Sequence, residues 1–129
     1  MYLAGQRVSL RSHHGKYLMA FPDGSVRWTS ASPEASGTFI VQPVGNGKVA
    51  FQTFYGKYLT ALPSGGLSAN SISATANEQF IIINVNGRVD LFTMYTSHRA
   101  YVSVQPNGTI EKRSVPKTWE AIQIGLVLN

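Results

Sequence analysis

The chain has 129 residues, of which 43% are hydrophobic and 13% are charged, and its formal net charge is +5. This length suits one domain with a core of its own, and the absence of cysteine excludes disulfides and thiol chemistry. Because no dense run of lysine and arginine occurs and no apolar stretch is as long as a membrane span, neither nucleic-acid binding nor a membrane helix is expected.

Four short strands are predicted in the first part of the chain, at residues 8–10, 16–21, 26–29 and 38–44. Val8 and Leu10 alternate with polar neighbours, which is the period of a half-buried strand. Pro22-Asp23-Gly24 predicts a turn between the second and third strands, because proline presets φ and glycine takes the left-handed position. After the fourth strand, Gly45-Asn46-Gly47 turns the chain again.

The same unit recurs further along the chain. Gly56-Lys57-Tyr58-Leu59 repeats Gly15-Lys16-Tyr17-Leu18 at an offset of 41 residues (56 − 15). A more diverged third copy begins near Val89, carries an insertion at residues 96–99 and ends at Trp119. The repeats are expected at residues 7–47, 48–87 and 88–129 of a single domain, 1–129.

Four strands in each of three copies, with no sustained helical period, predict an all-β protein of twelve strands. Such a count and repeat are typical of a β-trefoil, in which a six-stranded barrel is capped by three hairpins and no copy buries its apolar face alone. The core is predicted from apolar residues that recur in every copy. These sets are Val8/Val49/Val89, Leu10/Phe51/Leu91, Leu18/Leu59/Val102, Val26/Leu67/Ile110 and Phe39/Phe80/Trp119.

The recurring Gly-Lys-Tyr-Leu segments, set at fixed places relative to the apolar strands, resemble the repeats of the hisactophilin and fascin β-trefoils. The resemblance covers the whole chain and implies binding to actin filaments. The chain departs from hisactophilin in having only His13, His14 and His98 as histidines, so the pH-dependent membrane behaviour of hisactophilin is not implied. It departs from fascin in having one trefoil instead of four in tandem.

The chain also resembles the small β-trefoil lectins of mussels in size. It lacks the residues of ricin-type sugar sites, which use an acidic residue on the second strand and a Gln-x-Trp motif on the fourth. The acidic position is occupied by Ala20, Ala61 and Val104, and Gln79-Phe80-Ile81 is the nearest segment to the motif. Any sugar site is therefore expected to have another design.

Function is expected where the copies differ, since what they share serves the fold. Only the first copy carries histidines in its first turn and a tryptophan on its third strand. Sugar recognition needs an aromatic face for the pyranose ring and a few oriented polar groups. The predicted ligand-binding residues are His13, His14, Lys16, Asp23, Arg27 and Trp28. In the alternative interpretation, Trp28 covers the hairpin cap and the histidine turn is solvated.

The third copy offers a second candidate site, because it contains the most charged part of the chain. Its residues are His98, Arg99, Glu111, Lys112 and Lys117. They suit an anionic group, either on a sialylated or sulfated glycan or on an acidic actin surface. A diverged loop beside a solvated face is the alternative.

Catalysis is not expected, because the six carboxylates are scattered and no nucleophile motif accompanies the histidines. His13 and His14 are adjacent on the chain, which makes joint metal ligation awkward, so neither a metal nor another cofactor is expected. No signal peptide is recognisable, which favours a cytoplasmic location or release by a route other than the secretory pathway.

The sequence therefore favours a non-catalytic lectin that binds oligosaccharides or glycoconjugates at cell surfaces and contacts membranes only through glycans. The alternative is an actin-binding or actin-bundling protein of the hisactophilin and fascin type. Cross-linking by either requires multivalency, through several sites or a homodimer.

Overall fold

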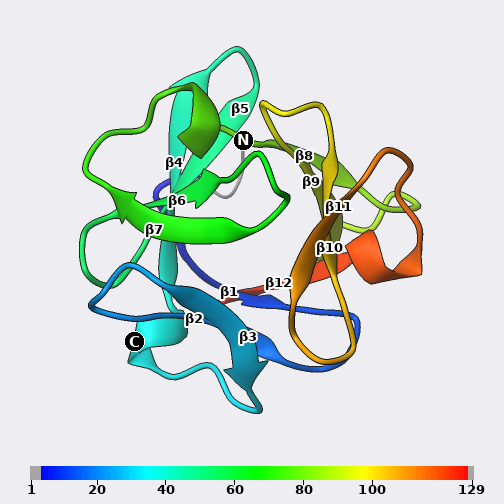
Figure 1. Ribbon diagram of the computed structural model, residues 1–129, viewed down its shortest axis with the longest axis horizontal. Helices are drawn as coiled ribbons and strands as arrows, with labels where there is room; N and C mark the ends of the chain where they lie inside the picture. The colour runs from blue at the N-terminus through cyan, green and yellow to red at the C-terminus, as the bar shows by residue number, and fades with distance from the viewer. Residues whose placement is uncertain (1–3, 128–129) are drawn as a thin grey trace.

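Three successive lobes make up the chain in the computed structural model, which describes residues 4–127 (Figure 1). Over these residues it forms twelve strands and three 3-10 helices of one turn each. The first lobe contains β1 (Arg7–Arg11), β2 (Tyr17–Ala20), β3 (Val26–Ser30), η1 (Ala35–Gly37) and β4 (Phe39–Gly45). The second contains β5 (Lys48–Gln52), β6 (Tyr58–Ala61), β7 (Leu67–Ser71), η2 (Ala76–Glu78) and β8 (Ile81–Asn84). The third contains β9 (Leu91–Tyr95), β10 (Tyr101–Val104), β11 (Ile110–Arg113), η3 (Thr118–Glu120) and β12 (Ile122–Leu126).

The first and last strands of every lobe close a six-stranded barrel. β1 pairs with β4 and β12, β4 with β5, β8 with β9, and β9 with β12, all antiparallel. The ring is completed by the bridge between Val49 of β5 and Phe80, just before β8. The hairpins β2–β3, β6–β7 and β10–β11 surround a common centre (Figure 1). This arrangement confirms the predicted β-trefoil, and closure leaves the barrel without an open edge.

The hairpin cap is cyclic, because each hairpin tip packs against the next lobe. The Gly24 carbonyl accepts a backbone hydrogen bond from β7 at 2.7 Å. A Cβ atom on Gly65 would lie 2.7 Å from Lys112 N, and one on Gly108 would lie 2.8 Å from the Trp28 carbonyl oxygen. All three glycines have positive φ, so both close approach and backbone conformation require glycine at the tips.

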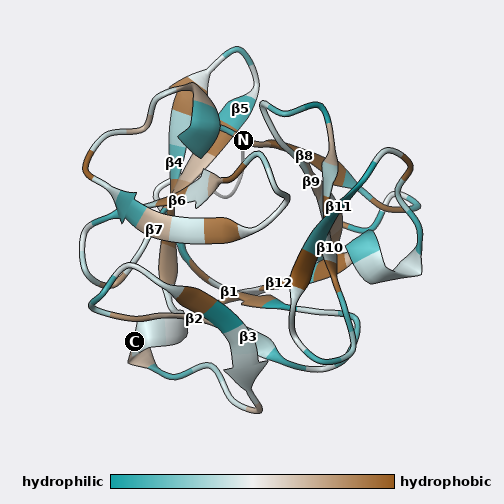
Figure 2. Cartoon of the chain, viewed as in Figure 1, coloured by the Kyte–Doolittle hydropathy of each residue, from teal (hydrophilic) through white to brown (hydrophobic). Residues whose placement is uncertain are grey.

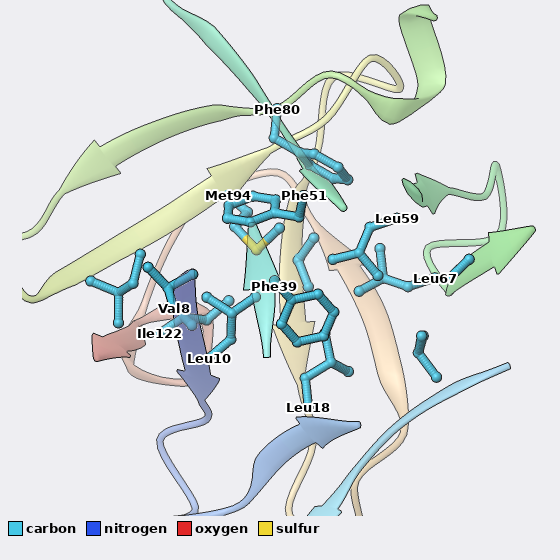
Figure 3. Close-up of a cluster of buried hydrophobic side chains, with 14 of the residues drawn as sticks. Val8, Leu10, Leu18, Phe39, Phe51, Leu59, Leu67, Phe80, Met94 and Ile122 are labelled. Atoms are coloured by element: carbon cyan, nitrogen blue, oxygen red, sulfur yellow. The ribbon is translucent and has the colours of Figure 1, made fainter. Parts of the chain in front are cut away.

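The core fills the barrel and the space beneath the cap. Figure 3 shows Leu18 and Phe39 of the first lobe converging with Leu59 of the second. The rings of Phe51 and Phe80 pack 5.9 Å apart between centroids. Apolar colour follows the barrel strands in Figure 2, whereas β11 is largely hydrophilic. No helix in the described part of the chain is long and apolar enough to cross a membrane. Of the predicted core residues, these are buried: Val8, Leu10, Leu18, Val26, Phe39, Val49, Phe51, Leu59, Leu67, Phe80 and Val102.

The predicted register of the third lobe is wrong. Val89 is 64% exposed and Leu91 is only partly buried, whereas Phe92 and Met94 are buried. The predicted insertion at residues 96–99 is the first turn of the lobe. Its hydrogen bonds, from Thr96 N to the carbonyl of residue 100 and from the amide of residue 99 to the Thr96 carbonyl, repeat those of the other first turns.

The end of the third lobe also differs from the prediction. Trp119, predicted as a core residue, lies within η3 and is 39% exposed. Ile122 takes the buried position that follows each 3-10 helix and that Phe39 and Phe80 occupy in the other lobes. Ile110 packs against the core but stays partly exposed.

Candidate functional site

A groove of about 700 Å³ lies where the first lobe meets the third, and we call it the basic groove. Three segments line it: the end of β1 with the following turn, the β8–β9 hairpin, and the residues around η3. The lining residues are Arg11, Ser12, His13, Ile83, Asn84, Val85, Asn86, Arg88, Leu91, Thr93, Pro116, Lys117, Thr118, Ala121 and Gln123. Hydroxyl, amide and cationic groups therefore surround a mixed polar and apolar surface.

Cationic side chains dominate the charge of the basic groove. Arg11 and Lys117 are exposed on two of its sides. Arg88 donates two hydrogen bonds to Asp90, at 3.1 and 2.8 Å. These bonds lower the pKa of the Asp90 carboxyl, which remains ionised and compensates Arg88. Arg11 and Lys117 consequently supply the uncompensated positive charge.

Aromatic rings continue the groove toward a second hollow. The rings of His13 and His14 meet edge to face at 5.3 Å between centroids, and those of His14 and Trp119 meet similarly at 5.2 Å. Trp119 lines the adjoining hollow, of about 550 Å³, which shares Lys117 and Thr118 with the basic groove. An exposed indole beside hydrogen-bonding groups is a suitable surface for the apolar face of a sugar ring.

Hydrogen bonds fix the histidine turn. His14 Nε2 lies 3.0 Å from the Val104 carbonyl oxygen, so this nitrogen carries the proton and donates it. The backbone N–H groups of His14 and Lys16 both donate to Ser12 Oγ, at 3.2 and 3.4 Å. The turn that carries His13 is thus attached to the third lobe, which forms the opposite wall.

A buried carboxylate fixes the turn that carries Lys117 and Trp119. Glu120 is 3% exposed and accepts hydrogen bonds from Ser103 Oγ and from the backbone N–H of Lys117. Ser103 belongs to β10, so the carboxylate connects η3 to the hairpin cap. Glu120 is therefore a positioning residue for this wall of the groove.

The structure separates the residues of the first predicted site. His13 lines the basic groove, and His14 lies beside it against Trp119. Trp28, in contrast, is 2% exposed, so the expectation of an accessible ring on β3 is wrong. The alternative holds for Trp28, which is buried in the core cluster with Ala69, but not for the histidine turn, because His14 is half-buried and bonds to the third lobe. Its Nε1 is the one buried side-chain nitrogen or oxygen without a hydrogen-bond partner in residues 4–127. A sugar cannot stack on this ring without opening the cap.

The remaining residues of the first predicted site do not line the basic groove. Lys16 is exposed after the histidine turn. Asp23 lies at the tip of the first hairpin, where its side chain accepts hydrogen bonds from the Ser25 hydroxyl and backbone N–H, which lower the pKa of its carboxyl. The Arg27 guanidinium lies 4.9 Å from the centroid of the Phe21 ring.

The second predicted site is similarly divided, and only Lys117 reaches the basic groove. His98 Nε2 bonds to the Ala61 carbonyl at 2.9 Å, as His14 does to its neighbouring lobe. Glu111 forms an exposed ion pair with Arg113 at 2.8 Å. The other two members are Lys112, whose Nζ donates to the Pro63 carbonyl at 2.9 Å, and Arg99, which has a positive φ of 60°.

Sequence reasoning missed Arg11 and Arg88 in the basic groove and Trp119 in the adjoining hollow. Trp119 had a detectable signal, since the buried glutamates Glu78 and Glu120 stand at equivalent ends of η2 and η3. Alignment on these glutamates places Trp119 in an exposed helical position. Within residues 4–127, no three histidine, cysteine, aspartate or glutamate side chains are grouped as metal ligands would be.

The fold and the groove together define a β-trefoil domain with a surface suited to binding. The chain belongs to the FRG1-like domain family, whose model matches residues 21–124. No curated protein matches the chain in sequence. The family match agrees with the expected β-trefoil, while the finer resemblance to hisactophilin, fascin and mussel lectins stays a prediction.

Proposed function

We propose that this protein is a non-catalytic lectin that binds cell-surface glycans in the basic groove. The observation that carries the proposal is the combination of uncompensated Arg11 and Lys117 with an exposed indole, that of Trp119, across one continuous surface. Sugars present hydroxyl groups and an apolar C–H face, and this surface offers partners for both. The low charged fraction of the chain, 13%, also suits neutral hydrogen-bonding ligands over most of the surface.

The positive charge of the groove favours glycans that carry an anionic substituent, either a sialic acid or a sulfate. Arginine binds such groups through a planar fork of donors, and lysine binds them as a point charge. In this arrangement Arg11 and Lys117 hold the anionic group, and the indole of Trp119 stacks on a neighbouring sugar ring. Asn84 Nδ2 already donates to the Arg88 carbonyl at 2.8 Å, so the amide oxygen of Asn84 is the part that is available to a sugar hydroxyl.

Charge reversal at the groove tests the proposal. Lys117→Glu should lower the affinity for sialylated and sulfated glycans at least tenfold, measured by glycan array and by titration calorimetry. Lys112→Glu is the matched control, because it makes the same change in net charge on the same lobe outside the basic groove. Equal binding by both variants, or no glycan binding by the unaltered protein, would exclude the proposal.

The alternative, actin binding, draws on the same positive charge, because an acidic protein surface also suits Arg11 and Lys117. It is supported further by the Gly-Lys-Tyr-Leu resemblance. Co-sedimentation with actin filaments tests it directly, with the same pair of variants. Pelleting of the unaltered protein, lost in Lys117→Glu and kept in Lys112→Glu, would favour actin over glycans.

A further inference from the structure

A second groove, of about 440 Å³, lies where the second lobe meets the first. It combines one exposed aromatic ring, two opposite charges and several small residues. Its lining includes Arg7, Pro33, Glu34, Thr53 and Phe54. We call this surface the second groove.

The second groove is the pseudo-symmetric counterpart of the basic groove. Both lie between the first turn of one lobe and the 3-10 helix of the lobe before it. The Thr53 N–H donates to the carbonyl of the residue four positions further on, and the Thr53 carbonyl accepts from the N–H of the residue three positions further on. Ser12 makes the same two hydrogen bonds in its own turn. Pro33 and Pro116 each stand two residues before their 3-10 helix. The equivalence therefore covers both walls.

The third position of this pseudo-symmetric set is bridged by a hydrogen bond between side chains. There, Ser97 Oγ donates a hydrogen bond of 2.8 Å to Asn77 Oδ1, which joins the first turn of the third lobe to η2. The other two positions lack this serine–asparagine pair and carry His13 opposite Trp119 and Phe54 opposite Ser36. The basic groove and the second groove lie at these two positions.

The two grooves carry side chains of opposite charge at one equivalent position. The residue preceding the 3-10 helix is Lys117 in the basic groove and Glu34 in the second groove. Glu34 disfavours an anionic ligand and can accept hydrogen bonds from sugar hydroxyls. Arg7 can donate to them, and neither residue forms an ion pair within residues 4–127. The ring of Phe54 is 60% exposed beside Tyr55, at 5.3 Å between centroids.

We infer that the second groove is a second binding site, and that it takes an uncharged sugar residue. Phe54 stacks on the apolar face of the sugar, while Glu34 and Arg7 hold its hydroxyl groups. The inference rests on the proposed lectin function and adds to it. One chain then carries two sites of different specificity, which allows it to bridge two glycans without forming a dimer.

Amide chemical shifts of the ¹⁵N-labelled 129-residue chain locate each site separately. One probe set contains the methyl glycosides of galactose, glucose, mannose and N-acetylglucosamine; the other contains the methyl glycoside of N-acetylneuraminic acid and a sulfated disaccharide. We expect a neutral probe to shift the amides of Thr53 and Glu34, and an anionic probe to shift those of Ser12 and Lys117. Phe54→Ala should reduce neutral binding at least tenfold and leave anionic binding unchanged, and its exposed position should preserve the fold.

The charge exchange Glu34→Lys should give the second groove a measurable response to the anionic probes. If the basic groove responds to its probes while no neutral glycoside shifts the amides of the second groove, the inference is wrong and the lectin proposal stands. If neither groove responds to any probe, both are wrong. A neutral response that survives in Phe54→Ala would also overturn the inference, because the ring would then not form the site.

Discussion

Removal of the Glu120 carboxylate should lower both the stability of the fold and ligand binding. It accepts hydrogen bonds from Ser103 Oγ and from the Lys117 backbone N–H, and the residue is 3% exposed. Hydrogen bonds to a charged group contribute about 1.5–3 kcal/mol each. Because Ser103 Oγ keeps its bond from Gln105 in Glu120→Ala, we expect the free energy of unfolding to fall by about 2–4 kcal/mol. Urea unfolding measures this loss.

Glu78 provides the matched control. It is 4% exposed and accepts hydrogen bonds from the Thr60 hydroxyl and from both the hydroxyl and the backbone N–H of Thr75. Glu78→Ala should lower the free energy of unfolding by a similar amount, about 2–4 kcal/mol. Titration calorimetry at a temperature where both variants are folded should show weaker glycan binding only in Glu120→Ala. Equal weakening in both would show that binding follows global stability, and unaltered binding in Glu120→Ala would refute its positioning role.

Three further predictions concern the cap and the groove. Trp28→Ala should lower the free energy of unfolding, measured with urea, by about 3–5 kcal/mol. Trp28→Phe should lower it clearly less, because phenylalanine keeps a ring in the core and removes the unpaired Nε1. Equal losses in the two variants would contradict the packing role. Gly108→Ala should lower the melting temperature more than Gly45→Ala, because both have positive φ but only Gly108 faces a close contact, 2.8 Å from a carbonyl oxygen; equal shifts would argue against the cyclic cap. The carboxyl of Asp90 should titrate below its ordinary pKa of 3.8 by NMR and closer to that value in Arg88→Ala. Because folding lowers this pKa, the contribution of the pair to stability is present above the unfolded pKa and is lost as the pH falls through the folded pKa.

The fold could be predicted because two copies retain nearly the same pattern. Leu18 and Leu59 follow identical Gly-Lys-Tyr segments, and each enters the core. Alternating apolar residues and glycine turns are local signals, so they indicate strands and their inward faces without knowledge of the tertiary contacts. The repeat then determines how such units assemble.

The third lobe was misaligned because its turn lacks the usual glycine. Arg99 adopts a φ of 60° at the position of Gly15 and Gly56, a conformation that costs a non-glycine residue about 1–2 kcal/mol. Without that glycine, the apolar alternation of Val89 and Leu91 was mistaken for the inward face of a strand. The hydrogen bonds of the turn at residues 96–100 set the actual register of the third lobe, and amino-acid composition does not reveal such bonds.

The roles of the two tryptophans could not be predicted from the sequence because they depend on contacts between lobes. Trp28 is buried because the equivalent position in the second lobe is occupied by the small Ala69, which leaves room beneath the cap. Trp119 is exposed because Ile122, and not the tryptophan, continues the chain into the barrel. Both outcomes depend on volumes shared between segments that are distant in the sequence. For the same reason, neither the first repeat nor the third repeat alone could predict that His13 and Lys117 line the same groove.

The lobes also differ in how their 3-10 helices are held, and this difference bears on the two grooves. η2 and η3 end in buried glutamates that bond to hydroxyls on β6 and β10, whereas η1 ends in Gly37, packed against Met19 of β2. A Cβ at Gly37 would lie 2.8 Å from the Met19 sulfur, so this contact depends on shape and not on directed bonds. The wall that carries Lys117 is therefore held by directed hydrogen bonds to a buried carboxylate, whereas the wall that carries Glu34 is held by close packing of Gly37 against Met19.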